Sequence, residues 1–484
     1  MIVGIDIGTQ SLKALVVDQT FQVLGEGSRS YEVDFPRPGW AEQNPRIWEE
    51  ALGPAVSAAL SSAGIPPTRI RALGIAGQLD GCIAADGKGI PLSPCLIWMD
   101  RRAESFLEGI PAEEVRTRAG VTLDASHMAA KIRWLEHNLT GSGRIAAYHQ
   151  PVSYIVARLT GRSVLDHGVA STTMVYSLRE RHYDPELLKL FEIKADRLPE
   201  IEEASAVAGT LHAAGALLTG LPEGIPVAVG TGDDFSNVLG SGERRPGRLI
   251  CTVGTAEVVG ALHTLPKVDA GGLVETHSFV EGLFFIENPG WLSGGALTWL
   301  AGLFELGDFQ DLVRRAAQTP AGADALLFIP ALSGAMAPEW IASARGCFYG
   351  LTPAHGVGHL ARAVLEGCAY AMRDVAERLK AMSVPLQEIL LLGGGARSRL
   401  WGRIRADVCN LPVILPSRKD TSPLGAAMLA AVAAGLHPNI GSCVGARAGP
   451  SESLEPDPSN RAVYDEGYSA YRRLFESLRP MYRG

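Results

Sequence analysis

The stretch MIVGIDIGTQSLKALVVD, residues 1–18, and the stretch RLICTVGTAEVVGAL, residues 248–262, share one pattern. In each, an apolar strand runs into a Gly-Thr pair (Gly8-Thr9 and Gly254-Thr255), and a second apolar run follows directly. The glycine permits a tight turn that exposes backbone N–H groups, and the threonine adds a hydroxyl. Taken alone, each stretch is an ordinary β-hairpin. Because each half of the chain carries one, the pattern predicts two facing loops that clamp a polyphosphate.

The first of these loops carries polar side chains that distinguish it from the second. Asp6 lies at the end of its strand, and a carboxylate there favours Mg²⁺ held between protein and phosphate. Gln10 and Lys13 lie in the same hairpin and could reach phosphate, although Lys13 is equally well placed to be a surface residue. No acid precedes Gly254-Thr255, so this loop is expected to hold phosphate through backbone and hydroxyl groups alone.

Length, charge and cysteine content restrict the class of protein. A chain of 484 residues predicts two domains of roughly 240 residues each. The formal net charge is −8 without a Lys/Arg-rich run, so nucleic acid is not an expected partner. The longest apolar stretch, residues 426–436, is too short to span a bilayer, and no signal peptide is evident. Seven cysteines without Cys-x-x-Cys spacing are typical of buried free thiols, which predicts a cytoplasmic protein.

The composition also suggests where the domains divide. The Gly- and Arg-rich segment GSGERRPGR, residues 240–248, predicts a boundary between a domain over 1–243 and a second domain over 244–484. Residues 104–220 have a mostly helical pattern and are expected to form an insertion over the first sheet. Residues 461–482 are expected to form one amphipathic helix, which could pack back across the hinge between the domains.

Polar side chains follow three predicted strands at their C-terminal ends, where open α/β sheets bind ligands. The three segments are Gly77-Gln78-Leu79-Asp80-Gly81 after a strand that begins at 70–74, Asp100-Arg101-Arg102 after 95–99, and Thr231-Gly232-Asp233-Asp234 after 226–230. Carboxylates and guanidinium groups hydrogen-bond vicinal hydroxyls, so Asp80, Asp100 and Arg101 suit a polyhydroxylated ligand. Alternatively, these three are solvated loop residues.

Asp233 is the candidate for proton transfer. It follows an apolar strand and two small residues, which leaves its carboxylate beside open space. A carboxylate there could take the proton of a substrate hydroxyl as that oxygen attacks phosphorus. Alternatively, Asp233 or Asp234 caps the next helix. The two interpretations are compatible if Asp234 is the cap and Asp233 the base.

A glycine run in the second half could admit a ligand to the backbone. Gly393-Gly394-Gly395 lies between a strand over 389–392 and a helix over 398–409, although a flexible turn would have the same sequence. The chain lacks both the full G-x-G-x-x-G fingerprint and the G-x-x-x-x-G-K-[ST] loop, so neither a dinucleotide fold nor an ordinary P-loop is expected. Trp40, His127, His263 and His277 have no evident partner and are interpreted as packing or surface residues.

Several stretches together resemble the FGGY carbohydrate kinases, which are two-domain enzymes of the actin-like ATPase superfamily. The most sharply defined is residues 346–366, where G-x-F-x-G-L, seven residues and H-L-x-x-A-V-L-E fit the family's C-terminal motif at every defined position. The resemblance runs in order over essentially the whole chain. The other matching stretches are residues 1–18, GIAGQLDG at 74–81, GTGDD at 230–234 and GGGARS at 393–398.

The resemblance implies two actin-like (ribonuclease H-like) α/β domains with an ATP and sugar cleft between them. It implies a sugar-binding N-terminal domain and an ATP-binding C-terminal domain, with Asp233 as the general base and Asp6 helping to hold Mg²⁺. It further implies that Thr9 and Thr255 line the phosphate site. The residues implied to surround the adenosine are Gly294, Gly394, Gly395 and Ala396. A homodimer is common in such families.

Within the family, the motifs resemble those of xylulokinases, through Trp40-Ala-Glu-Gln43 and Trp98-Met-Asp100. The expected reaction is therefore transfer of the γ-phosphate of ATP to a ketose, first of all a pentulose such as xylulose. Leu79-Asp80 departs from the Met-His pair of xylulokinases, which meets the sugar, and Asp100-Arg101-Arg102 is similar to the glycerol kinase branch. Kinases of glycerol, a tetritol or another polyol are thus alternatives, and a non-enzymatic actin-like nucleotide switch is the alternative of another class.

Overall fold

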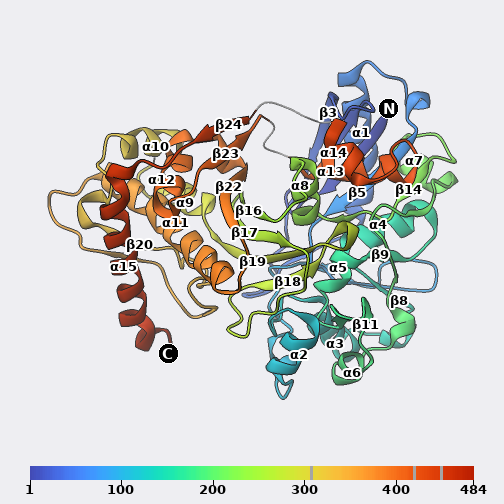
Figure 1. Ribbon diagram of the computed structural model, residues 1–484. Helices are drawn as coiled ribbons and strands as arrows, with labels where there is room; N and C mark the ends of the chain where they lie inside the picture. The colour runs from blue at the N-terminus through green and yellow to red at the C-terminus, as the bar shows by residue number, and fades with distance from the viewer. Residues whose placement is uncertain (306–308, 418–420, 447–450, 484) are drawn as a thin grey trace.

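The computed structural model describes residues 1–305, 309–417, 421–446 and 451–483, which form two lobes that each contain one large mixed sheet (Figure 1). The sheet of the first lobe has the strand order β13-β14-β5-β1-β2-β3, and β15 pairs with β5 beside β14. Its strands are β1 (Ile2–Ile7), β2 (Ser11–Val17), β3 (Val23–Ser30), β5 (Ala72–Gly77), β13 (Val207–Thr210), β14 (Pro226–Ala228) and β15 (Thr231–Gly232).

The second sheet repeats the plan of the first. Its order is β18-β19-β17-β16-β22-β23-β24, and the antiparallel hairpin β16–β17 lies beside the parallel strand β22, as β1–β2 lies beside β5. Both predicted Gly-Thr hairpins are therefore present, each in the middle of a sheet. The strands are β16 (Gly247–Val253), β17 (Ala256–His263), β18 (Glu275–Ser278), β19 (Phe284–Leu292), β22 (Leu386–Gly393), β23 (Val413–Pro416) and β24 (Ser451–Leu454).

Two helices from different halves of the chain lie between the sheets, namely α8 (Asp233–Ser241) and α13 (Ser422–Ala433). One apolar cluster joins them to both sheets, with Leu15 from the first and Ile250 and Leu390 from the second. Figure 1 shows α13, from the C-terminal half, among the strands of the first lobe. The core of the first lobe is thus completed by a segment that begins 345 positions after the end of β5, one of the two strands it contacts most (422 − 77). The predicted boundary at 240–248 stays a prediction.

Glycines allow α13 to lie directly on the backbone of the first sheet. A Cβ atom on Gly4 would be 1.9 Å from the carbonyl oxygen of Pro423, and one on Gly74 would be 1.9 Å from that of Ala426. No side chain fits into these gaps, because real Cβ atoms do not approach an oxygen so closely. The same requirement holds on the outer face, where α1 (Arg46–Ala63) packs against glycines of β3.

Residues 104–220 form the insertion that we expected, although part of it was predicted wrongly. Short strands alternate with the helices, and β13 is an edge strand of the main sheet rather than helix. The predicted strand over 95–99 is reduced to β7. The remaining elements of the first lobe, within this insertion and before it, are β4 (Glu42–Gln43), β6 (Ile83–Ala85), β7 (Cys95–Leu96), α2 (Ala112–Ala119), α3 (Met128–Asn138), β8 (Ala147–His149), α4 (Pro151–Thr160), β9 (Val164–Asp166), α5 (His167–Ser171), β10 (Tyr176–Ser177), β11 (His182–Tyr183), α6 (Pro185–Leu190), β12 (Glu200–Glu202) and α7 (Ala213–Thr219).

The last helix, α15 (Arg461–Leu478), does not cross the hinge, so that expectation was wrong. It buries Tyr464, Tyr471 and Phe475 in the core of the second lobe, at the side of that lobe away from the first (Figure 1). The remaining elements of this lobe are α9 (Gly294–Leu303), α10 (Phe309–Ala317), β20 (Leu327–Ile329), β21 (Cys347–Tyr349), α11 (Val357–Ala381) and α12 (Arg399–Cys409). Helix α14 (Ile440–Ala446) instead lies beside α13 at the first lobe (Figure 1).

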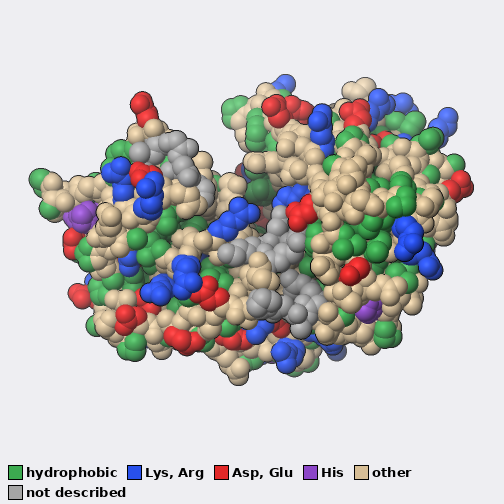
Figure 2. Space-filling model, turned by 90° about the horizontal axis from the view of Figure 1, so that it is seen from above, with side chains coloured by type: hydrophobic (Ala, Val, Ile, Leu, Met, Phe, Trp, Pro, Cys, Tyr) green, Lys and Arg blue, Asp and Glu red, His purple; other side chains and the backbone are tan. Residues whose placement is uncertain are grey.

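The surface is hollowed between the two lobes when the molecule is viewed from above (Figure 2). All seven cysteines are free thiols, and all are buried except Cys347, which is partly exposed. None of the helices in the described part of the chain is both long and apolar enough to span a bilayer.

The contact between α13 and the first sheet predicts the effect of a single methyl group. Gly4→Ala forces apart the backbones of β1 and α13, and we expect it to lower the free energy of unfolding by about 2–3 kcal/mol. Calorimetry should record a lower midpoint of thermal unfolding. Gly87→Ala is the matched control, because nothing lies within 4 Å of the Cβ position at Gly87. Equal midpoints for the two variants would contradict the close contact.

Candidate active site

Three parallel strands of the first sheet end at the same edge. β1 and β15 both pair with β5 in parallel, so that Ile7 and Gly232 each lie beside Gly77. The residues that follow these positions, Gln78 and Asp233, therefore meet at this edge, next to Asp6 near the end of β1. Asp6 and Gln78 are buried, with 6% and 2% of their surface exposed. The strand ends thus bring together three residues with different predicted roles: metal binding for Asp6, substrate binding for Gln78 and proton transfer for Asp233.

The first Gly-Thr loop is tied to the end of β5 through Gln43. The side-chain amide of Gln43 donates to the carbonyl oxygen of Thr9 at 2.9 Å, and its own oxygen accepts a hydrogen bond from the Gln78 amide at 2.9 Å. The indole N–H of Trp98 donates to the Thr9 hydroxyl at 3.1 Å. The Trp-Ala-Glu-Gln and Trp-Met-Asp motifs therefore position the first Gly-Thr loop and the end of β5 relative to each other.

Asp233 and Asp234 open helix α8. Gly232 is the N-cap, and neither acid caps the helix in the predicted way, although the Asp234 N–H donates to Oδ1 of Asp233 at 3.1 Å. Burial, followed by the negative charge of Asp234, raises the pKa of Asp233 to about 8. Burial, with Asp6 and Asp80, raises the pKa of Asp234 to about 6. A carboxyl group that titrates near neutral pH beside other acids is suited to exchange a proton with a substrate.

Leu79 and Asp80 lie beside this pair. The Leu79 side chain packs over Gly232, where an added Cβ atom would be 2.3 Å from Leu79 Cδ2. The backbone of Asp80 has a φ of 60°, a left-handed conformation that is uncommon outside glycine. Its carboxylate Oδ1 is 3.1 Å from Nδ1 of His127.

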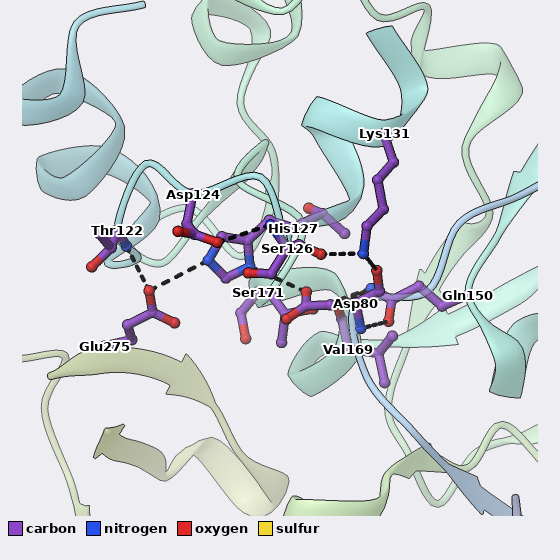
Figure 3. A network of polar contacts seen from close by, with 12 residues as sticks. Asp80, Thr122, Asp124, Ser126, His127, Lys131, Gln150, Val169, Ser171 and Glu275 are labelled. Carbon is purple, nitrogen blue, oxygen red and sulfur yellow. Dashed lines mark hydrogen bonds and ion pairs between the residues drawn. The ribbon is translucent and has the colours of Figure 1, made fainter. Parts of the chain in front are cut away.

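From the sequence, His127 was interpreted as a packing or surface residue without a partner. That interpretation was wrong, because both ring nitrogens of His127 face a carboxylate. It is buried and lies between Asp80 and Glu275, with Nε2 3.4 Å from Oε1 of Glu275 (Figure 3). Glu275 comes from β18 of the second sheet, far away in sequence. The local sequence offered only one signal, the spacing of His127 and Lys131, which places both on one side of the first turn of α3.

Asp100 and Arg101 are engaged by other parts of the protein. Oδ2 of the fully buried Asp100 accepts hydrogen bonds from the Ala41 N–H at 2.7 Å and the Arg102 guanidinium at 2.8 Å. The Arg102 guanidinium lies 3.7 Å from the ring centre of Trp40. Arg101 pairs with Asp124. These contacts hold the loop that carries the Trp-Ala-Glu-Gln motif, and contact of Asp100 or Arg101 with a substrate stays a prediction.

In the second lobe, three loops meet backbone to backbone. The carbonyl oxygen of Thr255 accepts hydrogen bonds from the N–H groups of Ser293 and Gly295, at 3.1 and 3.0 Å. A Cβ atom on Gly294 would be 2.2 Å from the carbonyl oxygen of Gly254, and one on Gly393 would be 2.5 Å from that of Val253. The predicted nucleotide residues of the second half, Gly254, Thr255, Gly294, Gly394, Gly395 and Ala396, thus lie on or beside these loops.

A fully buried ion pair holds two of these loops in place. It was not predicted from the sequence. Arg405 of α12 binds both carboxylate oxygens of Glu257, at 2.6 and 2.8 Å. The Ser293 hydroxyl donates to Oε2 of the same carboxylate at 2.6 Å. Because Glu257 follows the Gly-Thr turn by two residues, the pair fixes that turn relative to the loop at Gly294.

Comparisons with known proteins assign the chain to a family. Residues 1–240 match the N-terminal domain, and residues 249–434 the C-terminal domain, of the FGGY family of carbohydrate kinases. The chain belongs to this family. It is therefore an ATP-dependent carbohydrate kinase that acts on a small-molecule sugar, as predicted, rather than a non-enzymatic switch.

Individual relatives agree with this assignment. The kinase is 32% identical over 446 residues to a glycerol kinase of Thermococcus onnurineus, with 89% of both chains covered. It is 30% identical over 494 residues to a xylulose kinase of Escherichia coli, which covers 99% of this chain and 100% of the relative. The solved structure of a xylulose kinase from Rhodospirillum rubrum is 31% identical, with a TM-score of 0.90 and 100% of both chains covered. The predicted two-domain α/β fold is thus confirmed.

The buried ion pair in the kinase predicts a specific loss of stability. Arg405→Met leaves the Glu257 carboxylate buried and uncompensated, and we expect it to lower the free energy of unfolding by about 3–5 kcal/mol. The double variant Arg405→Met with Glu257→Gln removes both charges and should recover most of that loss. Calorimetry of the two variants and the wild type provides the comparison. A double variant as unstable as the single one would contradict the assignment of the loss to an unpaired buried charge.

Proposed function

We propose that this kinase transfers the γ-phosphoryl group of ATP to a hydroxyl of a ketose, first of all a pentulose such as xylulose. The observation that carries the proposal is the meeting of Asp6, Gln78 and Asp233 at the ends of three parallel strands. Gln78 and its neighbour Asp80 supply polar groups for a polyhydroxylated acceptor next to a candidate base. The similarity to xylulose kinases over the full chain length supports the pentulose.

In this proposal Asp233 accepts the proton of the attacking hydroxyl. Its raised pKa, about 8, makes it a stronger base than an ordinary carboxylate once it is ionised. The acceptor oxygen must point at the γ-phosphorus, and positioning of this kind supplies most of the catalysis in phosphoryl transfer. Closing of the lobes would exclude water and limit hydrolysis of ATP.

The nucleotide lies between the two Gly-Thr loops in this proposal. The residues assigned to its phosphates are Thr9, Gln10, Lys13, Gly254 and Thr255, and those assigned to the adenosine are Gly294, Gly394, Gly395 and Ala396. The close backbone contacts around Gly294 and Gly393 support this assignment, because they leave backbone groups rather than side chains at the surface of the loops.

Mg²⁺ is the expected counterion of the phosphates, and Asp6 is the residue that we assign to it. No group of three or more His, Cys, Asp or Glu side chains among the described residues is arranged to hold a metal ion. A carboxylate at the edge of the phosphate loop fits the way proteins bind Mg²⁺, since nucleotide oxygens and water complete its shell. When bound, the ion would neutralise charge on the transferred phosphoryl group.

A second candidate acceptor is glycerol, a tetritol or another polyol. The observation that favours it is Leu79-Asp80, which stands where a xylulokinase is expected to have Met-His, so that an acceptor-only carboxylate replaces a neutral or cationic donor. The similarity to glycerol kinases supports the same alternative. A coupled ADP assay with ketoses and polyols separates the two candidates.

Replacement of Asp233 tests its role directly. Asp233→Asn keeps the size of the side chain but removes the base, and we expect kcat to fall by about 10²–10⁴-fold. Titration calorimetry should show that ATP still binds, because the nucleotide contacts lie in other loops. Near-wild-type turnover in this variant would remove Asp233 from the mechanism.

The pair of acids also predicts the pH dependence. Asp234→Asn removes the negative charge that, after burial, raises the pKa of Asp233, so this pKa should fall. Because the base must be ionised, kcat/KM for the acceptor should decline as pH falls through the pKa of Asp233. The decline should begin at a lower pH in the variant than in the wild type. Asp196→Asn, which removes an exposed acid, is the control, and coincident profiles for all three proteins would contradict the coupling.

A further inference from the structure

Asp80 is held at three points by buried groups. Its N–H donates to the side-chain oxygen of Gln150 at 2.8 Å, and its carbonyl oxygen accepts a hydrogen bond from Nζ of Lys131 at 2.6 Å. The third point is its carboxylate, 3.1 Å from His127 (Figure 3). A left-handed aspartate costs free energy and persists only where its surroundings determine it. The surroundings here determine both the backbone and the direction of the carboxylate.

His127 connects Asp80 to the second lobe. Its other ring nitrogen lies 3.4 Å from Glu275, whose carboxylate also accepts a hydrogen bond from the Thr122 N–H at 2.7 Å. Burial lowers the pKa of His127, but the charges of Asp80 and Glu275 outweigh burial and raise it well above its ordinary value. The imidazolium thus fixes the orientation of Asp80 through contacts that link the end of β5 in the first sheet to β18 in the second.

The space beside Asp80 is acidic. Asp233 and Asp234 begin the neighbouring helix, and Glu287 of β19 lies close enough for Asp234, Asp233 and Asp80 to raise its pKa well above the usual value, after the effect of burial. Cationic groups nearby have protein partners. Lys131 donates to the carbonyl oxygens of Asp80 and Ser126. Arg101 pairs with Asp124, and His277 lies 3.5 Å from Glu287.

We propose that Asp80, positioned by His127, makes this kinase select neutral polyhydroxylated acceptors and reject the corresponding aldonates. A fixed carboxylate accepts hydrogen bonds from the hydroxyls of a ketose or polyol. The carboxylate of an aldonate in the same place would meet Asp80 as a like charge in a site of low dielectric. The inference rests on the proposed function and names the charge class of its acceptor.

The test compares two acceptors on one enzyme. We expect the wild type to have a kcat/KM for its best neutral acceptor at least about 100-fold above that for the aldonate of the same carbon number. Asp80→Asn keeps the shape of the side chain and removes its charge, and it should reduce this ratio by about tenfold or more. The ratio is independent of the fraction of folded enzyme, since both acceptors are measured on one preparation. Asp196→Asn, an exposed loss of the same charge, should leave the ratio unchanged.

His127 is a positioning residue, and its variant tests the geometry. His127→Gln retains an N–H donor for Asp80 but loses the positive charge. We expect it to raise KM for the neutral acceptor, leave KM for ATP unchanged and lower the discrimination against the aldonate. His182→Gln, which changes an exposed histidine of β11, is the matched control. Equal losses toward ATP and acceptor would indicate a merely structural role for His127.

The outcomes separate this inference from the proposed function. If a ketose or polyol is phosphorylated but the acceptor ratio does not respond to Asp80→Asn, the inference fails and the proposed function stands. If the wild type uses the aldonate as well as its neutral counterpart, the inference fails even when no variant can be purified. If the enzyme phosphorylates neither ketoses nor polyols, the proposed function fails as well.

Discussion

The close contact of α13 with β1 and β5 is the constraint on which the rest of the molecule depends. It exists because Gly4 and Gly74 leave no side chain between the helix and the strands. Through this contact the C-terminal half of the chain completes the core of the first lobe, and α13 with α8 forms the layer between the two sheets. The apolar area buried in this layer is available only when both halves are folded. The lobes are therefore joined through their core as well as through their surfaces.

The site follows from this architecture, because parallel strands that share a register deliver their next residues to one edge. The pairing of β1 and β15 with β5 is sufficient to bring together Asp6, Gln78 and Asp233, and direct contacts between their side chains are not required. Buried polar groups then fix the loops: Gln43 holds the first Gly-Thr turn, and the pair of Glu257 with Arg405 supports the second. The two loops thus have different supports. Asp6, the acid of the first, is buried at the edge where the strands end, while Glu257 of the second is paired with Arg405 in the core.

Much of the fold could be predicted from the sequence where the signal was local. The hairpins, the glycine run at 393–395 and the acid at Asp233 were recognised because each is defined by a few consecutive residues. The ion pair of Glu257 with Arg405 and the contact of His127 with Glu275 each join positions 148 apart in sequence. A local sequence pattern cannot identify partners so far apart. For the same reason, neither the packing of α13 on the first sheet nor the edge strand β13 was predicted. The orientation of Asp80 and of the second Gly-Thr turn depends on these distant contacts.

In the proposed function, the strand-end site transfers phosphate from ATP to a neutral sugar or polyol. Mass spectrometry of the reaction of the purified enzyme with ATP, Mg²⁺ and each of a set of ketoses and polyols tests it most directly. We expect an acceptor to gain one phosphoryl group with formation of an equal amount of ADP, and negligible ADP to form when the acceptor is omitted. Release of ADP at the same rate with and without every acceptor, or phosphoryl transfer only to aldonates, would contradict it.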